Sequence, residues 1–361
     1  MSSRPLRIGL LGFGGVVARF HVPALKAHAA RCEIAAVARG DANRLAEAKT
    51  LAGTHRGYAD WRELVADPDL DAVLIASPNA LHADQAVAAL EAGKDVLCEK
   101  PPAMNAAEAE RMAAAAVQHG RVLRYGFLLR YADESVRAKA EFDAGRLGEV
   151  YHVRARWFRR RGYPTQGSWF TTKRLSGGGV LADLGSHLLD RALWLLGYPR
   201  IEAVSAVTHA RLRESKVVQL MKSGPKSGNT GICDVEDLAV CLFRLGGGAS
   251  LILECSFAVN LPETPFSTDL LGDRAGLRLR PGQPVELFGE DGGAVTDTSI
   301  DPKGVAKDQH NLYERQIRAF LDAVQARDLS PAHPREGVAL MRALEAAYAS
   351  AERGREVGLG S

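Results

Sequence analysis

The sequence predicts an α/β protein of two domains. We expect a doubly wound parallel sheet with helices on both faces, followed by an α+β domain with a large, mostly antiparallel open sheet. The chain has 361 residues, which is too long for one compact core. In the first third, short apolar runs alternate with helical patterns, as in a parallel sheet. From about residue 125 this alternation ends, so we place one domain at 1–124 and the second at 125–361.

Apolar runs in the first domain predict the strands of the parallel sheet, and they lie at 6–11, 33–38, 71–78, 94–101 and 121–127. Helical patterns occur around 61–66, over 80–93 and over 105–120. On the helix over 80–93 we expect Leu81, Val87 and Leu90 to share the buried face. Gly120 ends the next helix, where a C-terminal glycine belongs.

The segment "LRIGLLGFGGVVARFHVPAL" combines the first strand with a glycine turn and a helix. Gly12 permits a tight turn, and Gly14 lets the backbone approach a pyrophosphate at the helix N-terminus. Val17 takes the place of the third glycine of the dinucleotide fingerprint. The flanking strand and helix favour a dinucleotide-binding Rossmann domain over a structural turn. The candidate cofactor contacts here are Gly12, Phe13, Gly14, Gly15 and Val16.

The end of the second strand bears on the choice of cofactor. An acidic residue there binds the ribose hydroxyls of NAD, but the run is "AAVARGDANR" and Arg39 stands near that place. A guanidinium favours the 2′-phosphate of NADP. Asp41 lies two positions on and is close enough in sequence to bind a ribose, and Arg39 as a solvated loop residue is the other alternative. NADP(H) is therefore favoured and NAD(H) remains open.

Two further strand ends carry polar residues. In "ASPNALH", Pro78 and Asn79 end a strand and His82 opens the next helix. In "CEKPP", Glu99 and Lys100 precede two prolines, so Lys100 is held extended and the bond after it can be cis. A lysine in a partly desolvated cleft can serve as an acid or base. By itself, however, "EKP" is also typical of a surface turn.

The segment "SGGGVLADLGSHLLDRALWLLG" places three glycines before an apolar helix. Such a run lets the backbone turn sharply or come close to another group. Asp183 and His187 are four residues apart and share a helix face, with Asp190 expected on the same side. They have the parts of an oriented acid–base pair. A polar stripe facing solvent or an interface is the alternative, and a metal site is disfavoured because no second histidine lies at ligand spacing.

These motifs, in this order and spacing, resemble those of the glucose-fructose oxidoreductase / inositol dehydrogenase / rhizopine catabolism (Gfo/Idh/MocA) family. The resemblance covers nearly the whole chain and implies an NAD(P)-dependent oxidoreductase of sugars or cyclitols. It implies that Lys100 lies by the nicotinamide and the substrate hydroxyl, and that Asp183 and His187 face the substrate. It also implies that the glycine run passes close to the nicotinamide. The resemblance implies cofactor contacts at Ser77, Pro78, Asn79, His82 and Lys100, and Arg39 and Glu99 are further candidate cofactor contacts.

The second domain begins with a helical pattern over 131–150 and a strand over 149–160. A hairpin follows over 234–259, joined at Gly246 to Gly248, and two helices close the chain. On the first of these helices an apolar face is expected, formed by Ile317, Phe320, Leu321 and Val324. Arg130, Trp169 and Phe170 are candidate substrate contacts besides Lys100, Asp183 and His187. The family resemblance implies a homodimer or homotetramer formed through the open sheet face.

Composition limits the partners and the compartment. The formal net charge is +3, so a nucleic-acid partner is not expected. An arginine cluster is read as a solvated strand face, or as the border of a pocket for an anionic substrate: Arg154, Arg156, Arg159, Arg160 and Arg161. The five cysteines form no C-x-x-C motif and indicate a reducing cytoplasm without a zinc site. We expect no signal peptide and no membrane span.

The expected reaction is hydride transfer between nicotinamide and the hydroxyl or carbonyl carbon of the substrate. His187, oriented by Asp183, transfers the hydroxyl proton, or Lys100 does so, and the sequence leaves the two open. Two other functions fit the same fold. One is a regulator that binds NADP without chemistry, and the other is a glycoside hydrolase that uses bound NAD.

Overall fold

A computed structural model describes residues 4–164, 167–213, 231–262, 266–301, 309–330 and 332–360. The chain forms two compact units, and each consists of two separate segments of the sequence. The N-terminal unit consists of Met1–Gly126 with Asp308–Met341. The C-terminal unit consists of Phe127–Lys307 with Arg342–Ser361. The first boundary between the units, after Gly126, thus lies two residues from the expected one. The inclusion of Asp308–Met341 in the N-terminal unit was not expected.

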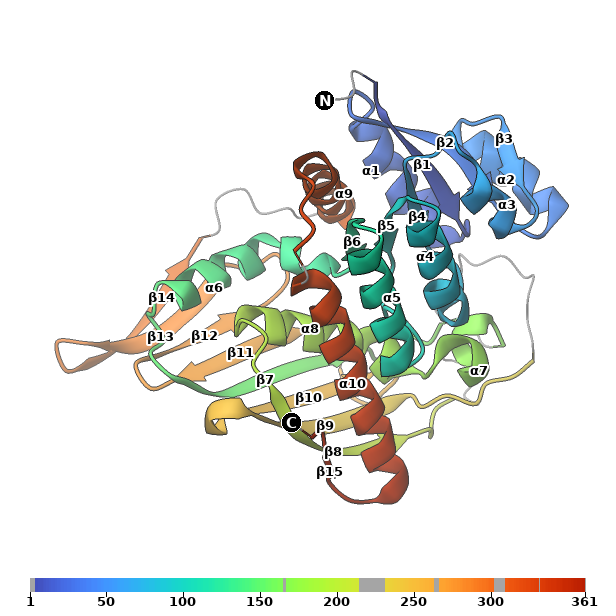
Figure 1. Ribbon diagram of the computed structural model, residues 1–361. Coiled ribbons are helices and arrows are strands. Elements are labelled where there is room, and N and C mark those ends of the chain that lie inside the picture. Colours follow the sequence, from blue (N-terminus) through green and yellow to red (C-terminus); the bar gives the residue numbers. More distant parts are fainter. Residues whose placement is uncertain are drawn as a thin grey trace. The chain divides into compact units, whose positions relative to one another are not determined.

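The N-terminal unit is built on a parallel sheet with the strand order β3-β2-β1-β4-β5-β6 (Figure 1). The strands are β1 Leu6–Leu11, β2 Cys32–Ala38, β3 Arg56–Tyr58, β4 Ala72–Ile75, β5 Asp95–Cys98 and β6 Leu123–Tyr125. The doubly wound arrangement is confirmed. Strand β3 was missed because three residues of the sequence Arg-Gly-Tyr form neither an apolar run nor an alternation.

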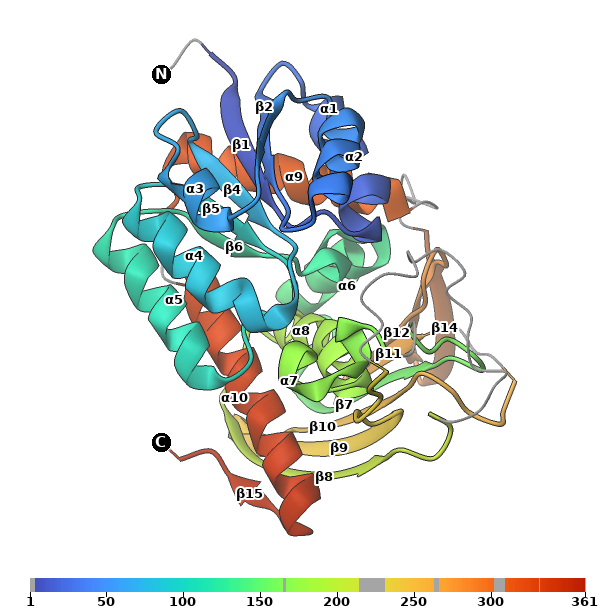
Figure 2. The same ribbon diagram turned by 90° about the vertical axis from the view of Figure 1, so that its right-hand side faces the viewer.

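Helices pack on this sheet, with α1 beside α9 and α4 beside α5 (Figure 2). Their bounds are η1 Val17–His21, α1 Val22–Ala27, α2 Ala42–Ala52, α3 Trp61–Ala66, η2 Asn79–Leu81, α4 His82–Glu91, α5 Ala106–Gln118 and α9 Gln309–Ala326. The buried face predicted for α4 is confirmed in part. Leu90 is fully buried and Val87 is half-buried, but Leu81 belongs to η2 and is exposed. The helix also buries His82 and Gln85, two polar residues that an apolar pattern does not reveal.

Helix α9 returns to the N-terminal unit and completes its core. Ile317, Phe320 and Leu321 pack in one buried cluster with β1 residues such as Ile8 and Leu10. The apolar face predicted for α9 is thus confirmed, but it packs on the Rossmann sheet instead of the second domain. The division between the two units falls within the next helix, α10 Ala332–Arg353.

The C-terminal unit contains a nine-stranded sheet of order β14-β13-β12-β11-β7-β10-β9-β8-β15. Its strands are β7 Val150–Phe158, β8 Ile201–His209, β9 Leu238–Leu245, β10 Ser250–Ser256, β11 Ser267–Gly272, β12 Ala275–Leu279, β13 Val285–Asp291, β14 Ala294–Ile300 and β15 Val357–Gly358. Neighbours are antiparallel except β7 and β10, which are parallel. The predicted mostly antiparallel sheet and the hairpin of β9 and β10 are confirmed.

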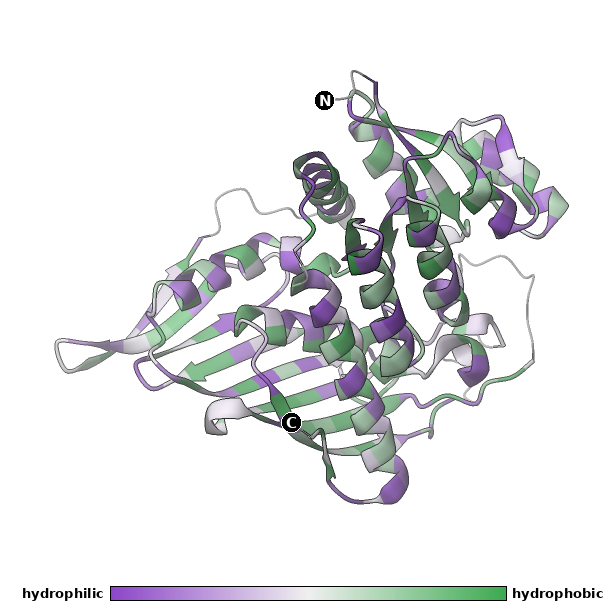
Figure 3. Cartoon of the chain, in the orientation of Figure 1, coloured by the Kyte–Doolittle hydropathy of each residue, from purple (hydrophilic) through white to green (hydrophobic). Residues whose placement is uncertain are grey.

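Side chains alternate along the central strands of this sheet, as the hydropathy colours show (Figure 3). Val153 and Ala155 of β7 are fully buried, whereas Arg154 between them is exposed. One face therefore packs on helices such as α8, and the other remains open within this unit. The helices of this unit are η3 Leu128–Tyr131, α6 Asp133–Asp143, η4 Trp169–Thr171, α7 Lys173–Ser176, η5 Leu181–Gly185, α8 Ser186–Leu195, η6 Gly246–Gly248 and the end of α10.

Candidate active site

The predicted cofactor residues of the N-terminal unit meet at the carboxyl edge of its sheet. Strands β1, β4, β5 and β6 are neighbours, and the backbone ladder continues just beyond them. The N–H of Ala76 donates to Leu11, that of Glu99 to Ile75, and that of Gly126 to Cys98. The glycine turn, the Ser77 loop and the Lys100 loop therefore start side by side. Ligands of open parallel sheets bind at this edge.

The glycine turn has one tightly packed member and one open one. Gly12 has a φ of 86°, and a Cβ there would lie 2.7 Å from the carbonyl oxygen of Ala76. A Cβ on Gly14 would have no atom within 4 Å. Val17, at the position of the missing third glycine, is fully buried and joins the core. The missing glycine thus reflects packing of η1, and the space beside Gly14 remains open.

Arg39 lies at the same edge, beside the glycine turn. Its guanidinium donates to the carbonyl oxygen of Phe13, and partial burial lowers its pKa. Asp41, the alternative ribose ligand, instead caps helix α2 by accepting the N–H of Arg44 at 2.9 Å. The arginine therefore lies where a cofactor ribose is expected, and the aspartate already has a structural partner.

The Ser77-Pro78-Asn79 loop is fixed from below by His82. This imidazole is 1% exposed. Its Nδ1 lies 2.9 Å from the carbonyl oxygen of Pro101 and its Nε2 3.0 Å from that of Ser77. Burial lowers the pKa of His82. Since both ring nitrogens face backbone carbonyls, His82 connects the two loops and does not present a nitrogen to a ligand, contrary to the contact expected from the sequence.

Lys100 follows β5 in a half-buried position, and its bond to Pro101 is cis. Behind it, Glu99 accepts the N–H of Lys100 through Oε2 at 3.2 Å and faces Nε2 of His21 through Oε1 at 2.7 Å. Glu99 thus supports Lys100 instead of opening toward a cofactor. Sequence reasoning missed His21, which belongs to η1 and is 78 residues from Glu99 in the chain.

In the C-terminal unit, Asp183 and His187 are partly exposed on an otherwise buried helix. Asp183 lies in the π-helical turn η5, and His187 lies in the first turn of α8. Between Gly178 and Leu193 these are the two residues that are not buried. Both side chains are thus partly exposed, and the shared face remains a prediction. π-Helical turns are frequent at functional sites.

The glycine run before this helix is filled by the protein itself. A Cβ on Gly178 would lie 1.9 Å from the Tyr348 hydroxyl, and one on Gly179 would lie 2.1 Å from the Glu236 carbonyl oxygen. The Glu236 carboxylate accepts the N–H groups of Gly179 and Leu181 at 2.9 and 3.0 Å, and the Tyr348 hydroxyl at 2.9 Å. Burial raises the pKa of Glu236. The implied approach of the nicotinamide is thus not needed to explain Gly178 and Gly179.

Arg130 and Asp190 form a buried ion pair, which corrects their predicted places. Arg130 Nε lies 3.0 Å from Asp190 Oδ2, and its Nη2 donates to the Tyr198 hydroxyl at 2.9 Å. The two side chains are 8% and 1% exposed. Asp190 is therefore buried against Arg130, whereas Asp183 and His187 are partly exposed. Arg130 neutralises a buried carboxylate, so the substrate contact expected of it is not supported.

Aromatic rings lie beside His187. Trp157 of β7 has its ring centroid 6.4 Å from that of His187 and stacks on Phe266 at 4.4 Å. The sequence reading missed both, because one lies in a strand and the other in a connection. The predicted pair Trp169 and Phe170 is half-buried and stacked at 3.8 Å.

The arginine cluster is not one surface. Arg154 is exposed and pairs with Glu254, and Arg161 donates to Val259 and Asn260. Arg159 lies over the Trp157 ring, 5.1 Å from its centroid. Only this member is placed near His187 by the contacts of the described residues.

Comparison with known proteins identifies the group to which this chain belongs. A family model described as an oxidoreductase family with an NAD-binding Rossmann fold matches residues 6–127. A model of the GFO/IDH/MocA C-terminal domain matches residues 135–295. The chain belongs to the Gfo/Idh/MocA family. It is therefore a nicotinamide-dependent oxidoreductase, as expected, and the sugar-directed function is confirmed at the level of the family.

Relatives of this family match over nearly the full chain. The D-glucoside 3-dehydrogenase of Escherichia coli (strain K12) is 33% identical, with 99% of each chain covered. The D-xylose 1-dehydrogenase (NADP(+)) 2 of Haloferax volcanii is 30% identical over 98% of this chain and 100% of its own. The structure of levoglucosan dehydrogenase with NADH has a TM-score of 0.85 at 23% identity, covering 99% of this chain and 100% of its own, and so shows the same fold.

One observation fits the glycine turn of this family member to a dinucleotide, namely the open space beside Gly14. Helix N-termini in general offer N–H groups to a phosphate. When bound, a nicotinamide supplies or accepts the hydride of the reaction. Gly14, Gly15 and Arg39 would hold its phosphates and ribose. No group of acidic, histidine or cysteine side chains among the described residues is arranged to hold a metal ion.

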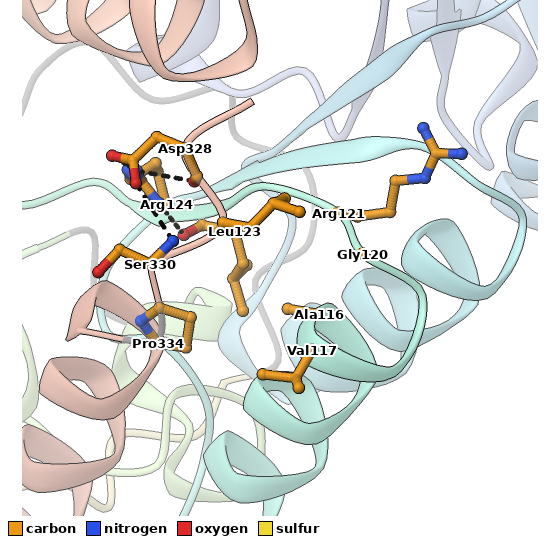
Figure 4. Close-up of a pocket in the computed structure, with 10 residues that line it drawn as sticks. Ala116, Val117, Gly120, Arg121, Leu123, Arg124, Asp328, Ser330 and Pro334 are labelled. Atoms are coloured by element: carbon orange, nitrogen blue, oxygen red, sulfur yellow. Dashed lines mark hydrogen bonds and ion pairs between the residues drawn. The ribbon is translucent and has the colours of Figure 1, made fainter. Parts of the chain in front are cut away.

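A separate cavity of about 240 Å³ lies at the other end of β6 (Figure 4). Its walls include Val117 of α5 and Leu329, and its rim holds Arg124 paired with Asp328 at 2.6 Å. Leu123, at the start of β6, also lines it. The amino ends of the strands are opposite the edge that binds ligands in this fold, so this cavity is distinct from the candidate cofactor site.

No described helix combines the length and the apolar composition needed to cross a membrane.

Proposed function

We propose that Lys100, Asp183 and His187 carry the chemistry of this oxidoreductase. The observation behind this proposal is that Asp183 and His187 are partly exposed on an otherwise buried helix. His187 transfers the proton of the substrate hydroxyl, and Asp183 orients its ring. Lys100 hydrogen-bonds the same oxygen. Donors placed before reaction stabilise the charge that develops on that oxygen.

NADP(H) is the proposed cofactor, with NAD(H) as a weaker alternative. Arg39 supports this choice because it provides a cation for a 2′-phosphate, while Asp41 is engaged in capping α2. The relative from Haloferax volcanii carries NADP(+) in its name. We expect kcat/KM to be higher with NADP⁺ than with NAD⁺, and Arg39→Ala to reduce that preference by about tenfold or more.

A pyranose or glycoside is the proposed substrate class. The relative that shares 33% identity is named for D-glucosides. Trp157, Phe266, Trp169 and Phe170 provide ring faces on which the C–H face of a sugar packs. Arg159 over Trp157 would add preference for an anionic sugar.

A homodimer or homotetramer through the open sheet face is also proposed. Leu242 and Ile252 are cross-strand partners on this half-buried face. A cavity of about 400 Å³ on the same sheet is lined by residues that include His152, Arg154 and Phe288. Light scattering after size exclusion tests the assembly, and Ile252→Lys should shift it toward monomer. The five cysteines, all free, support placement in a reducing cytoplasm.

The first experiment follows nicotinamide absorbance with NADP⁺ or NAD⁺ against glucosides, free aldoses, inositols, uronates and sugar phosphates. Turnover that Lys100→Ala and His187→Ala each lower by about 10² to 10⁴-fold, with cofactor affinity retained, supports the assignment. Near-normal turnover in either variant overturns the role of that residue. Release of a sugar without net cofactor reduction would instead identify a hydrolase, and cofactor binding without any turnover would favour a sensor.

A further inference from the structure

A histidine–glutamate pair lies directly behind Lys100, and the proposed chemistry gives it no role. His21 is fully buried, and its Nε2 lies 2.7 Å from Glu99 Oε1. With Glu99 as a carboxylate, which only accepts hydrogen bonds, the imidazole donates through an N–H at Nε2. The pair is therefore a charge-assisted contact with little solvent around it, since the Glu99 side chain is 15% exposed.

The same carboxylate also holds the backbone of Lys100. Its Oε2 accepts the Lys100 N–H at 3.2 Å. Gly126, just after β6, provides the space for this oxygen, because a Cβ there would lie 2.8 Å from Oε2. The Glu99 carboxylate thus contacts the His21 imidazole and the Lys100 N–H and packs against Gly126.

Helix α9 fixes the imidazole from the other side. The Tyr313 ring meets the His21 ring edge-on, with centroids 4.8 Å apart and an interplanar angle of 81°. Tyr313 also stacks on Phe20 at 4.9 Å. Among the described residues no hydrogen-bond partner faces His21 Nδ1, so the ring is placed by Nε2 and by Tyr313.

We propose that His21 is a positioning residue for Lys100, acting through Glu99. The imidazole holds the Glu99 carboxylate at the Lys100 N–H. This contact fixes the backbone of Lys100 and thereby the orientation of its side chain after β5. Misplacement of a reacting group by about 1 Å can cost 10²-fold in rate. This inference rests on the proposed role of Lys100 in the reaction.

The test compares His21→Leu with His21→Gln. Leucine fills the buried site without a donor, whereas the glutamine amide offers an N–H near the position of Nε2. We expect His21→Leu to lower kcat about tenfold or more while KM for the cofactor stays within about twofold, and His21→Gln to restore most of kcat. Leu64→Ala is the matched control, since Leu64 is a fully buried residue of the same unit that packs on Gly9. It should lower Tm without lowering kcat per bound cofactor.

A second variant reaches the same carboxylate from the opposite side and covers the case in which His21→Leu does not fold. Gly126→Ala should displace Glu99 and lower kcat in the same way. The double variant His21→Leu/Gly126→Ala should have a kcat little lower than that of either single variant, because both substitutions act on the contact between Glu99 and Lys100. In cofactor-free protein, the rate at which Lys100 is reductively methylated should change in both variants and not in Leu64→Ala.

The outcomes separate the inference from the proposed function. If Lys100→Ala abolishes turnover while His21→Leu and Gly126→Ala keep normal kcat, the positioning role is overturned alone. A loss in His21→Leu that His21→Gln does not rescue and that Leu64→Ala reproduces is structural, and it also overturns this role. If Lys100→Ala turns over normally, the role of Lys100 fails first and the positioning role with it.

Discussion

Two glycine-rich segments in this chain look alike in sequence and differ in structure. One runs from Gly12 to Gly15 and the other from Gly177 to Gly179, and each precedes a π-helical turn and an α-helix. Beside Gly14 there is no atom that a Cβ would meet within 4 Å. Beside Gly178 and Gly179, the Tyr348 hydroxyl and Glu236 fill the space.

The difference shows that a glycine indicates that another group comes close to the backbone, but not whether that group is a ligand or part of the protein. In the first segment the open side fits a ligand. In the second segment the partner is internal, because Glu236 satisfies N–H groups at the start of the π-helical turn, a helix end that otherwise lacks acceptors. Asp183 and His187 then remain as the accessible polar groups of the second region.

The largest effect on stability should come from the buried ion pair between Arg130 and Asp190 of α8. Arg130→Met leaves Asp190 as a buried carboxylate without its guanidinium, and we expect a loss of about 3 to 5 kcal/mol in the free energy of unfolding. Urea unfolding measures it. KM for the sugar should not change in the protein that remains folded. A raised KM with unchanged stability would restore Arg130 as a substrate contact. The double variant with Asp190→Leu should recover stability.

The next effect separates the two glycine segments directly. Gly179→Ala places a methyl group against the Glu236 backbone, and we expect about 2 to 3 kcal/mol of destabilisation, the upper part of the usual cost of overpacking. Gly14→Ala is the matched control. Its free energy of unfolding should stay within about 1 kcal/mol of wild type. Equal stability of the two variants would mean that Gly179 is not required by packing.

The sequence predicted the parts of the fold that depend on local pattern. Strands buried on both faces appear as apolar runs, which is why β1, β2, β4 and β5 were found. The face of α9 was also correct, but amphipathicity says only that a face is buried. It does not say against which sheet, so the return of α9 to the N-terminal unit could not be predicted.

The candidate site divides in the same way. Lys100, Asp183 and His187 belong to compact motifs, and their positions could be read locally. Their supports lie far away in the chain, with 78 residues between His21 and Glu99 and 57 between Gly179 and Glu236. His82, in the motif "ASPNALH", instead faces the carbonyl oxygens of Pro101 and Ser77 and is structural. Motif membership therefore does not separate chemistry from support.

The open side of Gly14 also makes a prediction about cofactor binding. If the open side of Gly14 receives the cofactor, Gly14→Ala should weaken cofactor binding by about tenfold, or about 1.4 kcal/mol. Quenching of protein fluorescence by NADPH measures the dissociation constant. Gly358→Ala, in β15 of the C-terminal unit, where a Cβ would have no atom nearer than 3.9 Å, should not change it. Unaltered binding in Gly14→Ala would place the cofactor elsewhere.

The smallest effect concerns His82, a motif residue that the N-terminal region uses internally. Its folded-state pKa is lowered by burial, so below about pH 6.5 the unfolded chain binds a proton that the folded protein resists. Stability is complete above that pH and falls as the pH decreases, by at most about 1.4 kcal/mol per pH unit for one proton. His82→Gln should remove this slope between pH 6.5 and the lowered pKa, whereas the exposed control His55→Gln should keep it. Urea unfolding at several pH values measures the slope. An unchanged slope in His82→Gln would mean that His82 is protonated in the fold, with both N–H groups donating to the carbonyl oxygens of Ser77 and Pro101.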